Sequence, residues 1–149
     1  MTFGINISMS VMSLAILIIK EENIMKFLIG LRNNVYADYI GYNLRLLGHD
    51  VMVVEGGSDI LDMLFRQNWD VVIVGILVNY YNGLEILDKY QKYCHERLKV
   101  EDDFVRAKIF IASSFFDKIS MQQAMSLGAA DYFVMPQDTD ELLNNILKK

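Results

Sequence analysis

The sequence predicts an α/β fold in which five parallel strands form one doubly wound sheet of strand order 2-1-3-4-5, with helices on both faces. From Lys26 onward, short β-branched runs alternate with amphipathic stretches, which is typical of repeated βα units. The short runs are apolar on both faces, as expected for strands that helices cover on both sides. Five such units within about 125 residues indicate a small doubly wound domain.

The first two βα units carry their own start and stop signals. A strand is expected at 27–31, and three apolar residues of the following helix recur at helical spacing: Ile40, Leu44 and Leu47. Gly48 ends this helix, consistent with a left-handed C-terminal cap. The next strand is expected at 51–54, and Ser58 is expected to cap a helix over 59–67. The inward positions of that helix are Ile60, Leu61 and Leu64.

The remaining units follow the same alternation. Strands are expected at 70–75, 108–112 and 132–134, and helices at 84–93, 120–127 and 140–147. Gly83 precedes the first of these helices and Gly128 ends the second. In a doubly wound sheet, ligands bind beyond the carboxyl ends of the strands, near the switch point between the first and third strands. Those ends lie at Leu31, Arg32 and Gly75, so a pocket is expected there.

Composition and charge favour a single compact cytosolic domain. The chain has 149 residues, 53% of them hydrophobic, and one proline, so it can bury a core. A net charge of -5 and a pI near 4.9 disfavour binding to nucleic acid through phosphate contacts. The single cysteine, Cys94, cannot form an internal disulfide. Cys94 and the adjacent His95 cannot easily face one metal ion, and no metal site is expected there.

Residues 1–24 do not match the rest of the chain. The run at 7–19 is apolar apart from serines, but it is shorter than the about 20 residues that span a bilayer, and it lacks signal-peptide features. Three interpretations stay open: an extra helix packed on the domain, a membrane-associating segment, or residues that are not made in the cell. We favour the third, because residues 20–23 can be encoded by a purine-rich ribosome-binding site just upstream of Met25. The domain is therefore expected over 25–149, without membrane contact.

Two motifs in the second half of the chain point to a known family. Residues 124–136 read AMSLGAADYFVMP, and residues 82–84 read NGL. They resemble the A-x-x-x-G-A-x-x-Y-x-x-K-P signature and the Asp-Gly-Leu turn of the response-regulator receiver domain family. The resemblance runs from about Lys26 to Lys149 and implies a flavodoxin-like, CheY-like fold. It also implies a cis peptide bond at Met135–Pro136.

The resemblance implies that the phosphorylation site of the family has degenerated here. The positions of the family's acidic pair hold Leu31 and Arg32. Gly75 stands at the position of the nucleophilic aspartate, and Met135 stands at that of the lysine. Two positions remain similar to the family: the hydroxyl at Ser113 and the switch aromatic at Tyr132. Phosphoryl transfer to a carboxylate needs the nucleophile, a divalent cation on oxygen ligands and positive charge over the phosphoryl oxygens. We therefore expect no enzymatic activity, no cofactor and no metal.

Three further features depart from the family or leave alternatives open. Asn79 replaces the proline usual after the third strand, which leaves that loop freer to move. The stretch between Gly83 and Ser113 is longer than usual, and we expect its charged residues 96–106 to form an inserted loop. Arg32 either occupies the former acidic pocket and locks an active-like conformation or points to solvent.

Exposed aromatic residues indicate where a protein partner could bind. The resemblance implies docking of a partner or a second copy on the face of the fourth helix, where Phe116 and Ile119 lie close to Phe115. The first helix carries Tyr36, Tyr39 and Tyr42, and the loop after the third strand carries Tyr80 and Tyr81. Aromatic residues are enriched in interface hot spots, although helical spacing also places some of these tyrosines in the core.

Three hypotheses about function follow. The first is a stand-alone pseudo-receiver of a two-component-type system that acts, independently of phosphorylation, by binding a protein partner such as a kinase, regulator or effector, or a second copy. The alternative is a domain that binds a small molecule or anion in the vacated pocket through Arg32, Ser113, Asn79 and backbone amides. A third, which we disfavour because no metal site supports it, is phosphorylation of Ser113.

Overall fold

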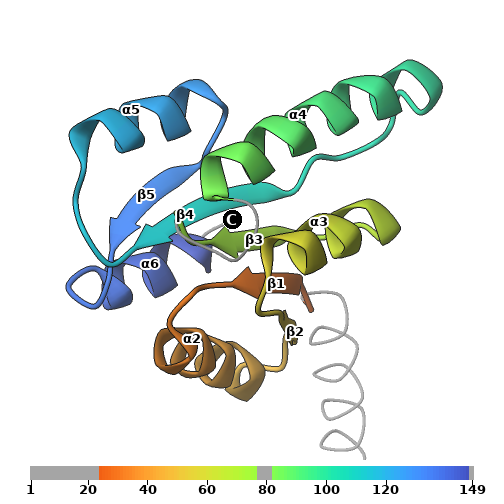
Figure 1. Ribbon diagram of the computed structural model, residues 1–149. Coiled ribbons are helices and arrows are strands. Elements are labelled where there is room, and N and C mark those ends of the chain that lie inside the picture. Colours follow the sequence, from red (N-terminus) through yellow and green to blue (C-terminus); the bar gives the residue numbers. More distant parts are fainter. Residues whose placement is uncertain (1–23, 77–81, 148–149) are drawn as a thin grey trace, which may run out of the picture.

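The computed structural model describes residues 24–76 and 82–147. Their strands form one parallel sheet in the order β2-β1-β3-β4-β5, as predicted (Figure 1). The strands are β1 (Lys26–Gly30), β2 (Asp50–Val53), β3 (Val71–Val74), β4 (Lys108–Ser113) and β5 (Asp131–Val134). The helices are α2 (Asn34–Leu46), α3 (Gly57–Arg66), α4 (Gly83–Val100), α5 (Lys118–Ser126) and α6 (Thr139–Ile146). Each expected strand and helix is present, with bounds that differ mainly at the ends.

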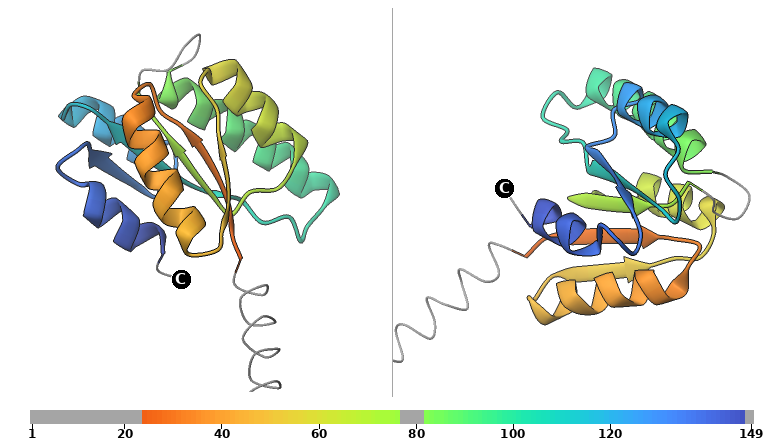
Figure 2. Two further views of the ribbon diagram at one scale, coloured as in Figure 1. Left: turned by 90° about the horizontal axis from the view of Figure 1, so that it is seen from below. Right: turned by 90° about the vertical axis from the view of Figure 1, so that its left-hand side faces the viewer.

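Helices cover both faces of the sheet, α2 and α6 on one side and α3, α4 and α5 on the other (Figures 1 and 2). Side chains alternate between the two faces along each strand. In β1, Leu28 packs in the apolar cluster with α3, α4 and α5, whereas Phe27 and Ile29 pack in the cluster with α2 and α6. Burial on both faces explains why the strands are apolar throughout.

The register of the sheet brings the carboxyl ends of neighbouring strands to one level. Gly30 of β1 lies opposite Val74 of β3, and Ser113 of β4 lies opposite Val134 of β5. Leu31 and Gly75 follow directly, and the Gly75 amide still donates a hydrogen bond to the Gly30 carbonyl at 3.0 Å. This edge is the location predicted for the pocket.

Glycines end two of the helices as predicted, because both adopt the left-handed backbone conformation that glycine tolerates best. Gly48 has φ +91° after α2, and Gly128 has φ +94° after α5. Of the three apolar residues at helical spacing, Ile40 and Leu44 are buried, whereas Leu47 caps the C-terminus of α2 and is exposed. Its backbone leaves the helical path at this point, so the helical spacing no longer orients its side chain.

The predicted N-cap of α3 is also wrong. Gly56 occupies the cap position and Ser58 lies inside the first turn of the helix. Gly57 is buried, so tertiary packing starts the helix earlier than the capping preference of serine would. Ile60, Leu61 and Leu64 are buried as predicted.

The charged stretch predicted as an inserted loop mostly extends a helix. Helix α4 runs for 18 residues to Val100, and only the short segment 101–107 connects it to β4. Two ion pairs one turn apart support the added turns: Glu96–Lys99 and Arg97–Glu101. The loop prediction was therefore wrong for residues 96–100.

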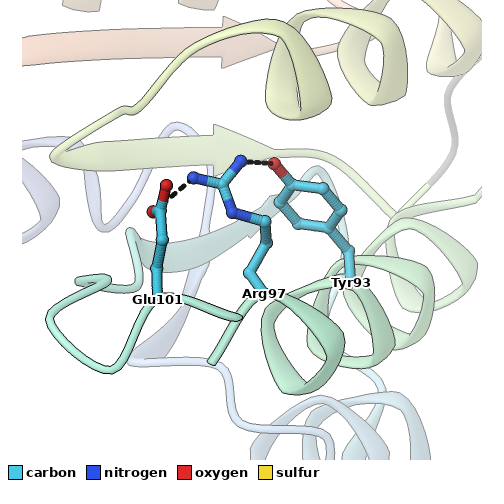
Figure 3. Close-up of polar contacts among 3 residues, drawn as sticks. All are labelled: Tyr93, Arg97 and Glu101. Carbon is cyan, nitrogen blue, oxygen red and sulfur yellow. Dashed lines mark hydrogen bonds and ion pairs between the residues drawn. The ribbon is translucent and has the colours of Figure 1, made fainter. Parts of the chain in front are cut away.

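Aromatic contacts fix the end of this extension. The Arg97 guanidinium donates hydrogen bonds to the Tyr93 hydroxyl at 3.1 Å and to the Glu101 carboxylate at 2.6 Å (Figure 3). The same guanidinium lies 5.1 Å from the centre of the Phe104 ring, a cation–π distance. Phe65 of α3 packs on Tyr93 with 4.7 Å between ring centres. The extension is thereby tied to α3 and to the connection that follows it.

Some sequence predictions lie outside the described residues. They concern residues 1–23, with the apolar run at 7–19, and Asn79, Tyr80 and Tyr81. In the part of the chain that the structure describes, no helix has the length and apolar character needed to cross a membrane.

Candidate functional site

A cavity of about 460 Å³ opens at the carboxyl edge of the sheet. It is lined by Leu31, Arg32, Asn33, Tyr36, Gly75, Ile76, Ala112, Ser113, Ser114, Phe115 and Met135. The lining comes from the ends of β1, β3 and β4 and from the residue after β5, which are distant in sequence. Five positions of the predicted degenerate site, Leu31, Arg32, Gly75, Ser113 and Met135, therefore meet in one cavity.

Apolar side chains occupy the places where the family resemblance implies metal ligands and a lysine. Leu31 and Met135 are almost fully buried and belong to the cluster that packs against α2 and α6. None of the described lining residues is an aspartate or glutamate. No group of three or more histidine, cysteine, aspartate or glutamate residues in 24–76 and 82–147 could hold a metal ion.

Gly75 leaves room for a side chain. A Cβ atom built on Gly75 lies 3.4 Å from the Ala112 carbonyl oxygen and 3.7 Å from Leu31 Cδ2. These are ordinary van der Waals distances. Gly83 differs, because a Cβ atom there clashes with the backbone carbonyl oxygen of Gly75. The backbone thus requires glycine at position 83 and tolerates other residues at position 75.

Arg32 supplies the only charge among the described lining residues. Its side chain is exposed, and no hydrogen bond or ion pair with another described residue holds the guanidinium. The lock that we considered for Arg32 therefore has no fixing contact in the described part of the chain. Asn33 beside it is engaged, since its side-chain oxygen caps α2 by accepting from the Val35 amide at 2.9 Å.

Phe115 connects the two positions that resemble the family. The Ser113 hydroxyl accepts a hydrogen bond from the Phe115 amide at 3.3 Å. The Tyr132 hydroxyl donates to the Phe115 carbonyl oxygen at 3.4 Å, and both Ser113 and Tyr132 are buried. Tyr132 is therefore hydrogen-bonded to the loop between β4 and α5, and this loop lines the cavity.

The turn after β5 has the backbone geometry that the family resemblance implies. The Met135–Pro136 bond is cis, as predicted. The Met135 amide donates to the Ser113 carbonyl at 2.7 Å, and the Asp138 side chain accepts from the Val134 amide at 2.8 Å. These bonds attach the turn to β4 and place the Met135 side chain at the cavity.

Two groups of the predicted interface residues are exposed. Phe116 and Ile119 are 61% and 66% exposed, beside the half-exposed Phe115. On α2, Tyr39 and Tyr42 are also exposed, whereas Tyr36 is partly buried and lines the cavity. Sequence reasoning missed Asn33, Ile76 and Ser114 as lining residues. Each of them directly neighbours a predicted site residue or strand end, which was the signal available.

Cys94 and His95 do not form a site. The Cys94 side chain is buried under α4, where burial raises the pKa of its thiol, and His95 is exposed. A buried thiol with a raised pKa is unreactive at neutral pH. Cys94 belongs to the core.

Comparisons with known proteins agree on the fold. The receiver domain of a Francisella response regulator superposes with a TM-score of 0.69 at 20% identity, covering 82% of this chain and 93% of that chain. The Vibrio cholerae chemotaxis protein CheY4 gives a TM-score of 0.69 at 16% identity, covering 83% and 96%. A CheY-like receiver domain from Methanospirillum hungatei gives 0.68 at 17% identity, covering 83% and 91%.

The structural neighbours are thus receiver domains of response regulators. No family model matches the sequence. The chain has the CheY-like, flavodoxin-like fold, with five parallel strands in the order 2-1-3-4-5 and helices on both faces.

Proposed function

We propose that this protein is a receiver-type signalling domain of a two-component-type system that works without phosphorylation and without catalysing a reaction, by binding a partner protein. One observation carries the proposal. The cavity at the carboxyl edge has a receiver's position and scaffold but presents leucine, glycine and methionine where phosphoryl transfer needs carboxylates and a lysine.

The described residues that line the cavity lack the metal ligands and the activated nucleophile that phosphoryl transfer requires. Without an acidic side chain on the described lining, Mg²⁺ lacks the oxygen ligands that it needs. Arg32 adds positive charge beside the former metal position, which disfavours a cation further. Among the described lining residues, Ser113 carries the one buried hydroxyl, and no carboxylate or histidine is present to act as its base.

The exposed apolar side chains at the start of α5 support protein binding. Phe116 and Ile119 expose most of their surface next to the loop that Tyr132 contacts through Phe115. Exposed aromatic and aliphatic residues close together are typical of interface hot spots. We propose this surface, Phe115, Phe116 and Ile119, as the docking site for the partner protein, and call it the α5 patch.

A first experiment tests the absence of phosphorylation. The purified protein is incubated with a small-molecule phosphodonor and Mg²⁺, and its intact mass is measured. We expect no added phosphate, because nucleophile and metal ligands are absent together. One added phosphate on any residue would refute the proposal.

A second experiment tests the α5 patch. The double variant Phe116→Ser, Ile119→Ser should lose the proteins that co-purify specifically with the wild type from its own cells. The matched control is Val100→Ser, Val105→Ser, which removes two exposed valines, one at the end of α4 and one in the connection to β4. This control should retain the co-purifying proteins. The proposed docking site would be wrong if the control also lost the co-purifying proteins, or if a folded Phe116→Ser, Ile119→Ser variant retained them.

Binding of an anion or small molecule in the cavity is the second candidate function. The lone positive charge of Arg32 beside the hydroxyls of Ser113 and Ser114 favours it. Calorimetry with inorganic phosphate should then detect binding that Arg32→Gln removes. Identical titrations for wild type and variant would exclude this function for phosphate.

A further inference from the structure

Helix α2 carries two apolar faces, of which only one is used by the domain. The buried face packs on the sheet through Ala37, Ile40, Gly41 and Leu44. The outward face carries Val35, Tyr39, Tyr42 and Leu46, each between 50% and 72% exposed. We call these four side chains the α2 seam. An amphipathic helix of a monomeric domain usually presents polar residues outward. The exposed apolar seam therefore indicates that another helix or surface binds there.

The spacing of the seam is that of a helix–helix interface. Its members are four, three and four residues apart, which is the a/d spacing of a heptad repeat. At 3.6 residues per turn, the four side chains fall within about 60° of the helix circumference. Scattered surface hydrophobes would not line up in this way. A helix of similar character fits such a seam best.

The charges beside the seam identify the partner helix as a second α2. Asp38 and Arg45 lie on one flank, and Tyr36 and Asn43 lie on the other. When two α2 helices run antiparallel, Asp38 of each copy faces Arg45 of the other, because equivalent flank positions meet in that arrangement. In a parallel pair, Asp38 would meet the neutral Asn43 instead. The charge pattern is therefore self-complementary in the antiparallel orientation only.

We propose that two copies of this protein associate through α2 in an antiparallel, two-fold symmetric arrangement. Twofold symmetry makes every contact occur twice, so each dimer gains two Asp38–Arg45 pairs. Arg45 donates to the Val51 carbonyl at 3.1 Å within its own copy, and a guanidinium has five donors, which leaves several for the partner.

The surroundings leave this face accessible among the described residues. Helix α2 lies at the periphery, beside the edge strand β2, and no coloured element in Figures 1 and 2 covers its outer side. The α5 patch belongs to the opposite face of the sheet, so this dimer does not depend on the proposed function. A seam of three helical turns buries an area at the small end of the range for protein–protein interfaces. We therefore predict weak association that depends on concentration.

Sedimentation equilibrium of the full chain tests the dimer. The wild type should shift from monomer to dimer with rising concentration. Tyr42→Glu should raise the dissociation constant at least about tenfold, because it places charge at the centre of the seam. The matched control, Phe116→Ser, should leave the dissociation constant unchanged. A wild type that stays monomeric over the whole concentration range would overturn the proposal.

Charge reversal tests the antiparallel orientation. Asp38→Arg and Arg45→Asp each place like charges opposite one another twice, and each should raise the dissociation constant by about tenfold. The double variant Asp38→Arg, Arg45→Asp restores opposite charges and should return to within about threefold of the wild type. Thermal unfolding establishes that each variant is folded at the temperature of the measurement. A double variant as weak as either single variant would overturn the orientation.

Discussion

The two edges of the sheet use their polar side chains differently. At the amino edge, the Asp70 carboxylate accepts from the Lys26 amide at 2.7 Å, and His49 Nδ1 accepts from the Met25 amide at 3.1 Å. At the carboxyl edge, Arg32 makes no such contact with the described residues, and Ser113 makes one longer bond of 3.3 Å to Phe115. Asn33 and Asp138 also bind backbone amides at the carboxyl edge, so the difference lies in Arg32, whose charged side chain remains available to a ligand.

This difference separates what builds the fold from what performs chemistry in a receiver. The carboxyl edge has a glycine at position 83 that the backbone requires and a cis bond at Met135–Pro136. Leu31, Gly75 and Met135 stand at positions where the family resemblance implies reactive side chains. Buried apolar side chains and the hydrogen bonds between strands hold the sheet, so its architecture does not require reactive side chains at these positions.

The largest expected effect contrasts two glycines of the carboxyl edge. Gly83→Ala should lower the free energy of unfolding by at least about 2 kcal/mol, because its Cβ would overlap the Gly75 carbonyl oxygen and neither backbone can yield cheaply. Gly75→Ala is the matched control and should stay within about 1 kcal/mol of the wild type. Denaturant unfolding followed by circular dichroism measures both. Equal costs would show that position 75 is also constrained by packing.

A smaller effect compares one polar side chain from each edge. Asp70→Ala should cost about 1 kcal/mol, because the Lys26 amide loses its acceptor. Ser113→Ala should cost less than about 0.5 kcal/mol, because the bond that it loses is long. The same unfolding measurement checks both variants. A larger loss for Ser113→Ala would mean that the cavity hydroxyl is structural.

The smallest effect is the pH dependence of the amino edge. Burial lowers the pKa of His49 below its usual 6.5, an effect that the carboxylate of Asp70 partly offsets. Since the unfolded chain then binds a proton more readily, the contribution of His49 to stability is complete above pH 6.5 and declines as the pH falls through the native pKa. The unfolding midpoint should therefore fall between pH 7.5 and 5.5 more for the wild type than for His49→Gln. Parallel profiles would contradict this.

The apolar pattern of the sequence was sufficient to predict the order of the elements and most of the core. Buried strands and inward helix positions such as Ile40 and Leu64 depend on periodicity, which the sequence contains directly. The N-cap at Gly56 was not predictable, because burial of Gly57 in the folded domain overrides the capping preference of Ser58. The length of α4 could have been predicted, since Arg97 and Glu101 have the spacing of a helical ion pair.

The site was predictable in its membership but not in its side-chain geometry. The family resemblance placed five residues at one edge, and the fold brings them into one cavity. Whether Arg32 would have a fixed partner depends on surrounding side chains that are distant in sequence. The α2 seam was not predicted from the sequence. The tyrosines of this helix were grouped by residue type, without considering that Tyr39 and Tyr42 are spaced to share one face with Val35 and Leu46.

We propose that the cavity does not support phosphoryl transfer, and the Gly75→Asp variant gives the sharpest test of this proposal. A Cβ atom fits at position 75 without a clash and the position lines the cavity, so we expect the variant to fold, which its melting temperature will show. Its intact mass is measured after incubation with a small-molecule phosphodonor and Mg²⁺. We predict no added phosphate, because Leu31, Arg32 and Met135 still deny the metal and the charge balance. One added phosphate on the Gly75→Asp variant would show that the cavity still supports phosphoryl transfer and would refute the proposal.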